Sequence, residues 1–268
     1  MVEASSRGYD SATLRVGTLN LRNTSDRWPE RYPLLAAQLS ELSPDIIGFQ
    51  ELRRPSFQGR RIERGANAGV DEREALYRLY KQWKTGIRWL WEGLAILTEL
   101  PVLAHERLDL GGGNRVAQRL CVRLVDGQVL DFYNTHLHHS ADDHDLRLRQ
   151  AERILEWMKA HAGVPQVLVG DFNALPDDPA IQRILGPGGL QSAFVAVHGE
   201  KLTATVPTPL SYHRDDEEKV IDYIFVNDLI EVHDAWITFD RAHDSDERLS
   251  ASDHFGLAAT ISLNTWAT

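Results

Sequence analysis

Carboxylate, amide and imidazole side chains recur in this chain at the edges of short apolar segments. Some directly follow such a segment and others directly precede one; they are Asn20, Glu51, His136, Asp171, Asp222, Asp253 and His254. In antiparallel strands the start of one strand lies beside the end of its neighbour, so these edges can meet on one rim of a sheet. The sequence therefore predicts a polar site built at strand ends.

The donor atoms in this set point to a hard cation. Four carboxylates and an amide suit Mg²⁺ or Mn²⁺ better than a metal that prefers thiolates. Cys121 is the only cysteine, which excludes an intrachain disulfide and a thiolate cage for zinc. A hard cation beside a phosphoryl group stabilises the charge that develops on its oxygens and activates a water molecule. These residues predict metal-assisted hydrolysis of phosphate esters.

Two kinds of segment must position these residues. Short apolar runs predict strands, at residues 14–19, 45–49, 86–97, 119–125, 129–134, 167–169, 221–226 and 256–263. Apolar residues at helical spacing predict helices, at residues 29–42, 75–84 and 145–161. Asp126 and Gly127 predict a tight hairpin. Hairpins mixed with crossover helices favour a mixed sheet or two stacked sheets covered by helices, which is an α/β layered sandwich.

Composition is typical of a globular protein. The chain has 268 residues, of which 43% are hydrophobic and 25% charged. We expect residues 1–12 to form a flexible N-terminus and residues 13–268 to form a single domain. No apolar run approaches the roughly 18 residues that span a membrane, and the first residues lack a leader pattern. These features predict a cytoplasmic protein with no membrane span and no evident protein partner.

Charge argues against general binding to polyanions. The net charge is −10, and contacts from Lys and Arg to phosphates dominate affinity for nucleic acids. One local exception is a cluster of arginines in a glycine-containing segment, formed by Arg53, Arg54, Arg60, Arg61, Arg64 and Arg73. We interpret residues 53–75 as a solvated, mobile excursion from the fold.

Read in order, six motifs resemble those of the endonuclease/exonuclease/phosphatase superfamily, which includes deoxyribonuclease I. They are RVGTLN at 15–20, DIIGFQE at 45–51, NTHL at 134–137, GDFN at 170–173, IDYIFV at 221–226 and SDHFGL at 252–257. The resemblance implies a four-layered α/β/β/α sandwich with two packed mixed β-sheets. It also implies a Mg²⁺- or Mn²⁺-dependent hydrolase that cleaves phosphodiesters or phosphomonoesters.

The same resemblance implies roles for the metal and for the attacking water. Glu51 corresponds to the principal metal carboxylate, with Asn20 and Asp253 as nearby oxygen ligands, directly or through water. Asp171 resembles the residue that orients or deprotonates the attacking water. Asn173 resembles the amide that holds a phosphate oxygen.

Further residues correspond to groups that contact the phosphate. His254 matches the histidine that contacts the scissile phosphate, and Asp222 the carboxylate that orients it; such a pairing stabilises the cationic imidazole. His136 resembles a second phosphate-facing group. Arg115 and Arg147 lie near places where related proteins carry basic residues that touch phosphate or brace the site, so both are candidate substrate-binding residues.

One departure bears on the substrate. Abasic-site endonucleases carry an acidic residue two positions after the Asn of the first motif, where this chain has Arg22. A role in DNA repair is therefore not carried over. Together with the acidic net charge, this favours a phosphate-ester substrate that is a small molecule or a single-stranded nucleic acid.

Three alternatives remain open at the level of sequence. The chain can be a metal-dependent nuclease on DNA or RNA, or a noncatalytic module that binds phosphorylated ligands. It can also be a zinc hydrolase that uses the segment HLHHSADDH, which contains His136, His138, His139, Asp142, Asp143 and His144. This segment resembles the metallo-β-lactamase motif only loosely, because Ser140 occupies the position where that motif has Asp.

Overall fold

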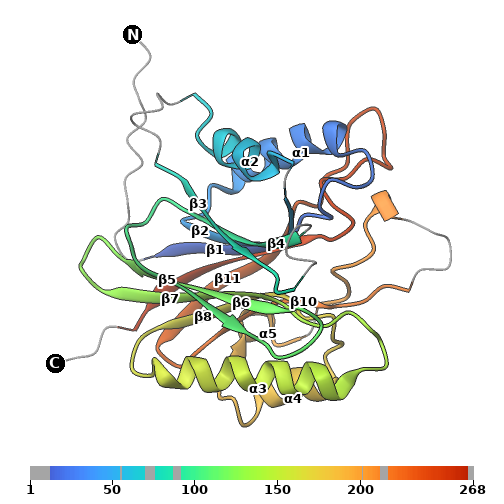
Figure 1. The fold of residues 1–268 in the computed structure, drawn as a ribbon. Helices are drawn as coiled ribbons and strands as arrows, with labels where there is room; N and C mark the ends of the chain where they lie inside the picture. Colours follow the sequence, from blue (N-terminus) through green and yellow to red (C-terminus); the bar gives the residue numbers. More distant parts are fainter. Residues whose placement is uncertain are drawn as a thin grey trace.

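Two six-stranded β-sheets packed face to face form the centre of the part of the chain that the structure describes. The structure is a computed structural model that describes residues 13–54, 56–69, 76–86, 92–200, 202–211 and 217–264. Helices α1 (Trp28–Leu42) and α2 (Gln58–Ala66) lie over one sheet, and α3 (His144–Ala160) and α4 (Pro179–Leu185) over the other (Figure 1). This confirms the predicted four-layered α/β/β/α sandwich.

The first sheet has the strand order β11-β12-β1-β2-β4-β3. Its strands are β1 (Leu14–Asn20), β2 (Ile46–Arg53), β3 (Arg78–Trp83), β4 (Glu92–Thr98), β11 (Ile230–Thr238) and β12 (Gly256–Leu263). Only β1 and β2 among its neighbouring strands pair in parallel, and α1 connects them. The parallel pair places the ends of β1 and β2 at the same edge of the sheet.

The second sheet repeats this pattern, in the order β5-β6-β7-β8-β10-β9. Its strands are β5 (Val102–Asp109), β6 (Val116–Arg123), β7 (Val129–His136), β8 (Gln166–Asp171), β9 (Gln191–Ser192) and β10 (Asp222–Val226). Strands β7 and β8 are parallel and joined by α3, while the other neighbours are antiparallel. The short helix α5 (Ala193–His198) follows β9 directly.

The core between the sheets consists of side chains that alternate inward along the central strands. Val16, Ile46, Phe132 and Val167 are each fully buried there. Separate apolar clusters fill the space between each sheet and its helices, so each central strand is buried on both faces. Burial on both faces explains why these strands are continuous apolar runs in the sequence. Within the described residues, no helix is both long and apolar enough to cross a bilayer.

Most predicted elements are present, and local chemistry explains their ends. Helix α1 has a proline in its first turn and ends at Ser43, which adopts a left-handed conformation with φ 46°. Helix α3 starts where the Asp143 side chain accepts a hydrogen bond from the backbone N–H of Leu146. The hairpin predicted at Asp126 and Gly127 joins β6 to β7, which pair antiparallel as expected.

Two predictions in the segment after β2 are wrong. Residues 78–83 form strand β3 instead of part of a helix, because they pair with β4 and complete the edge of the first sheet. The excursion predicted at residues 53–75 contains helix α2, since Ile62 has an apolar cluster to pack into and is fully buried. The predicted flexible N-terminus and residues 70–75 and 87–91 lie outside the described residues.

Candidate active site

Strand pairing in the second sheet places three polar side chains next to one another. His136 at the end of β7 is in register with Asp171 at the end of the parallel strand β8. Asp171 is in turn in register with Asp222 at the start of the antiparallel strand β10. All three residues are buried. The backbone alone thus gathers an imidazole and two carboxylates at one rim.

Gly170 makes this close arrangement of strands feasible. Its φ is +151°, and a Cβ atom at this position would lie 2.1 Å from the carbonyl oxygen of Thr135 on β7. No side chain fits there, so the glycine of the GDFN motif is required by the approach of β7 to β8.

The first sheet contributes residues that reach across to this rim. The Nδ2 of Asn20, at the end of β1, donates a hydrogen bond of 2.9 Å to Oδ2 of Asp171. The loop that carries Asp253 and His254 precedes β12, the antiparallel neighbour of β1. Its Ser252 hydroxyl donates to the backbone oxygen of Asn20 at 2.6 Å. Ends of both sheets therefore meet around Asp171.

Glu51 enters the site from an irregular part of β2. The pairing of β2 with β4 shifts register between Phe49 and Leu52, and Glu51 has a φ of +57°. A bulge of this kind turns a side chain away from the direction that regular pleating would give it. The Nδ2 of Asn23 donates to Oε2 of Glu51 at 3.3 Å. Positive φ at a non-glycine residue also occurs at Asn173, with φ +49°.

These side chains surround one polar cavity of about 560 Å³. Its walls contain residues from the ends of both sheets and from the loops between them: Arg22, Glu51, Lys84, Glu92, Gly113, Arg115, His136, His139, Asp171, Asn173, Asp253 and His254. Asp222 lies behind His254, and Asn20 lies behind Asp171. The cavity is large enough for a phosphate ester with part of its leaving group.

One cluster of this site contains its own positive charge. His254 Nδ1 lies 2.9 Å from Asp222 Oδ2, and its Nε2 lies 4.0 Å from Asp171 Oδ2. Burial alone would lower the pKa of His254, but Asp222 and then Asp171 outweigh it and raise the pKa to about 10. Burial and the charge of Asp222 raise the pKa of Asp171 to about 7. At neutral pH the cluster holds a cationic imidazole beside a carboxyl that can bind or release a proton.

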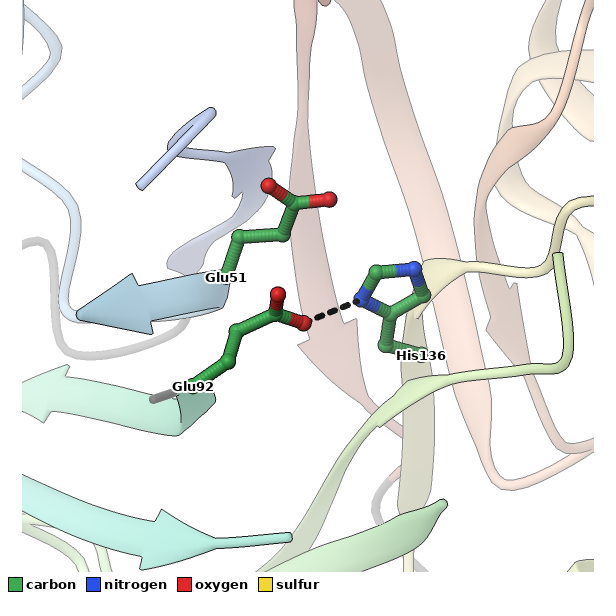
Figure 2. A group of neighbouring side chains, drawn as sticks. All are labelled: Glu51, Glu92 and His136. Atoms are coloured by element: carbon green, nitrogen blue, oxygen red, sulfur yellow. Dashed lines mark ion pairs between the residues drawn. The ribbon is translucent and has the colours of Figure 1, made fainter. Parts of the chain in front are cut away.

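A second cluster has the opposite electrostatic character. Glu51, Glu92 and His136 point toward one another from β2, β4 and β7, and His136 Nδ1 lies 3.8 Å from Glu92 Oε1 (Figure 2). Burial, then Glu92 and Asp253, raise the pKa of Glu51. Burial, then Arg115 and Lys84, lower the pKa of His136 well below its ordinary value. This cluster thus has acidic groups but a neutral imidazole.

Three charged residues of the cavity wall, Arg22, Lys84 and Glu92, were not among the candidate site residues. Glu92 and Lys84 form an ion pair on neighbouring strands of the first sheet. Arg22 forms an ion pair with Asp253, with 3.0 Å between Nη1 and Oδ2. Neither Glu92 nor Lys84 lies in a recognisable motif, so only the pairing of β2 and β3 with β4 reveals their position. Arg22 was noted in the sequence only as a departure from the abasic-site endonucleases.

Arg115 and Arg147, both predicted to bind substrate, occupy different environments. Arg115 lines the cavity, and its Nη2 lies 3.2 Å from Nδ1 of His139. Arg147 is buried and does not line the cavity. It bonds Asp178 at 2.8 Å and the carbonyl oxygens of residues 140 and 141. Its donors therefore hold the loop before α3, which is a bracing role and not the predicted contact with substrate.

Two histidines of the HLHHSADDH segment, His138 and His144, pair with different aspartates. His144 Nδ1 lies 2.6 Å from Asp178, and His138 Nε2 lies 3.5 Å from Asp143. Within the described residues, neither belongs to a group of side chains that could share a metal, whereas His136 does. The chain leaves β7 after His136 and turns into α3, which carries His144 away from the rim, whereas His139 still lines the cavity beside Arg115.

Comparison with known proteins agrees with the fold and with the order of the motifs. A model of the Endonuclease/Exonuclease/phosphatase family matches residues 17–254. The chain therefore belongs to this family, whose members hydrolyse phosphate esters.

Individual relatives are distant. Protein angel from Drosophila melanogaster is 29% identical over 217 residues, which is 74% of this chain and 58% of that protein. The chain spans between 42% and 58% of the length of the curated relatives that it matches. An endonuclease/exonuclease/phosphatase family protein from Bacteroides thetaiotaomicron superposes with a TM-score of 0.79 at 21% identity, covering 94% of this chain and 98% of that chain.

D. rerio TDP2, whose structure was determined with a single-strand DNA product, superposes with a TM-score of 0.77 at 16% identity. The match covers 93% of this chain and 98% of that chain. At these identities, the structural similarities show a shared fold.

Proposed function

We propose that this chain is a divalent-metal-dependent phosphoesterase that hydrolyses phosphodiesters or phosphomonoesters by attack of water. The observation that supports this most strongly is that one cavity gathers Glu51, Asp171, Asp253 and His254 from both sheets. Carboxylates that face a cavity beside a cationic imidazole are suited to a phosphate group and its counter-ion.

Mg²⁺ or Mn²⁺ fits the oxygen donors on the acidic side of the cavity. Burial and the neighbouring carboxylates of Glu92 and Asp253 raise the pKa of Glu51, so a cation placed there would relieve their repulsion. Glu51 and Asp253 would hold the ion, with Asn20 close by, and the ion would supply Lewis-acid stabilisation of phosphate charge. Asn20 Oδ1 also accepts the backbone N–H of Arg22 at 2.9 Å, which fixes its orientation.

Asp171 orients the attacking water and accepts its proton. The Nδ2 of Asn20 and the backbone N–H of Asn173 each donate to this carboxylate at 2.9 Å, so its direction is fixed. Its pKa of about 7 places it where a general base is most effective near neutral pH. Asn173 lies on the cavity wall next to it and contacts a phosphate oxygen.

His254 provides the positive charge that binds the reacting phosphate. Its ring is held by Asp222 on one side and faces Asp171 on the other. His136 is neutral and therefore acts as a hydrogen-bond donor to the phosphate or the leaving oxygen, not as a cation. Arg115 and Lys84 add positive charge to the same wall.

A turnover assay with a panel of phosphate esters tests this proposal. Purified protein is incubated with Mg²⁺ or Mn²⁺ and with bis(p-nitrophenyl) phosphate, nucleotides, inositol phosphates, phospholipids and single-stranded oligonucleotides. We expect turnover that EDTA abolishes and that Asp171→Asn removes. Absence of turnover across the panel, with a folded protein and ligand binding intact, would instead indicate a noncatalytic binding module.

A further inference from the structure

The arginine-rich segment after β2 forms a surface strip beside the cavity. We define the α2 strip as Arg54, Phe57, Arg60 and Trp83. Residues 53–64 carry five arginines and one glutamate, in a chain whose net charge is −10. The strip is therefore a local concentration of positive charge on an acidic protein.

The aromatic rings of the α2 strip are paired with guanidinium groups. Phe57 precedes α2 with 68% of its surface exposed, and Arg60 Cζ lies 5.5 Å from the centre of its ring. Arg54 Cζ lies 5.3 Å from the centre of the Trp83 ring. Aromatic faces interleaved with cations stack on bases and bind phosphates.

The strip is continuous with the catalytic cavity. Trp83 is followed directly by Lys84, which lines the cavity and forms an ion pair with Glu92. On the helix side, the buried Gln58 accepts the backbone N–H of Arg53 at 2.8 Å and donates to the backbone oxygen of Asn23 at 2.6 Å. Asn23 itself contacts Glu51. The start of α2 is therefore fixed to the same rim that carries the candidate metal carboxylate.

We infer that the α2 strip binds a single-stranded nucleic acid whose scissile phosphate lies in the cavity. This inference rests on the proposed phosphoesterase function and narrows its substrate class. The strand leaves the cavity past Lys84, with phosphates on Arg54 and Arg60 and a base stacked on Phe57. A duplex is disfavoured because its paired bases cannot stack on a ring, and because the rest of the surface is acidic.

A double substitution that removes one ring and one charge tests the strip. Phe57→Asn with Arg60→Ser removes both groups and suits the start of α2, since Phe57 has a φ of 51° and asparagine tolerates this left-handed conformation. The matched control is Val125→Ser with Arg123→Ser, an exposed apolar and basic pair beside the hairpin between β6 and β7. That hairpin lies at the end of β7 opposite to His136.

Binding of a fluorescent oligo-dT ten-mer is measured by anisotropy in EDTA, and hydrolysis is measured separately with bis(p-nitrophenyl) phosphate. We expect the strip variant to bind the oligonucleotide at least about tenfold more weakly than the wild type. The slope of log affinity against log salt concentration should decrease in magnitude by roughly 0.7, because one phosphate contact is lost. Its turnover of the small ester should equal that of the wild type. The control variant should match the wild type in both assays.

Three results would overturn the inference. They are a wild type that does not bind the oligonucleotide, equal oligonucleotide affinity in both variants, and a strip variant that loses binding only to phosphatidylserine vesicles. The last result would assign the strip to a membrane surface. Failure of the proposed function is distinguishable, because a protein that hydrolyses no phosphate ester can still bind the oligonucleotide in EDTA.

Discussion

The two titratable clusters of the rim contain similar side chains but carry different charge. His254 Nδ1 lies 2.9 Å from Asp222 Oδ2, which outweighs burial and raises its pKa. His136 lies 3.5 Å from Asp171 and 3.8 Å from Glu92, but these carboxylates already face His254 and Lys84, and burial, then Arg115 and Lys84, lower its pKa. One imidazole is therefore cationic and the other neutral. A carboxylate that already has a cation partner does little to protonate a second base. An external cation is therefore expected beside Glu51, whose neighbours are carboxylates, and not beside Asp171, which already faces the cationic His254.

The largest expected effect on turnover comes from removing the cationic imidazole of His254. His254→Ala leaves Asp222 without its partner and the phosphate without its positive contact. We expect turnover to fall by about three orders of magnitude or more, mainly in kcat, because the contact is strongest in the transition state. Steady-state kinetics together with circular dichroism measures this. Unchanged turnover in a folded variant would remove His254 from the mechanism.

Neutralising one carboxylate of the acidic cluster of Glu51, Glu92 and His136 should stabilise the metal-free protein. Glu51→Gln relieves repulsion with Glu92 and Asp253, so we expect the Tm in EDTA to rise by roughly 2 °C. The same variant should lose the rise in Tm that Mn²⁺ produces in the wild type. Differential scanning fluorimetry with and without Mn²⁺ tests both. A variant that is less stable in EDTA yet still stabilised by Mn²⁺ would contradict the assignment.

Unfolding at different pH values distinguishes the titration of His254 from that of Asp171, which belong to one cluster with Asp222. The pKa of His254 is raised from 6.5 to about 10, so its stabilising contribution is complete below pH 6.5 and is lost as pH rises toward 10. The pKa of Asp171 is raised from 3.8 to about 7, so the contribution of this carboxyl to the unfolding free energy decreases as pH rises from about 4 to about 7.

Urea titrations in EDTA measure these windows. The gap in unfolding free energy between the wild type and His254→Gln should narrow above pH 6.5. The gap between the wild type and Asp171→Asn should change mainly below pH 7. Identical pH profiles for the two gaps would show that the residues do not titrate as separate groups.

The smallest expected effect is at Glu92. Glu92→Gln removes the partner of Lys84 and one of the carboxylates near Glu51. We expect Mn²⁺ affinity to fall by only a few-fold, since Glu51 and Asp253 remain, and we expect KM to change more than kcat. Isothermal titration and steady-state kinetics measure the two effects. A complete loss of Mn²⁺ binding would make Glu92 an essential ligand.

The central strands and the residues at their ends were predictable from sequence. Strands buried on both faces are continuous apolar runs, and the polar residue that ends each run is visible, as Asp171 is after VLVG. Helix α2 and strand β3 were not predictable. Their residues are charged and irregular, and only the cluster around Ile62 and the pairing of β3 with β4 determine their conformations.

The sequence by itself determined which chemical groups stand at the strand ends, because strand periodicity fixes where apolar runs stop. Only the tertiary structure decided how these groups are charged. His136 and His254 have the same ordinary pKa, and burial lowers the pKa of both. Their difference arises from which carboxylates and cations other strands place within a few ångströms. Coulomb interactions depend on distance in space, and distances between segments far apart in the chain are set only by folding.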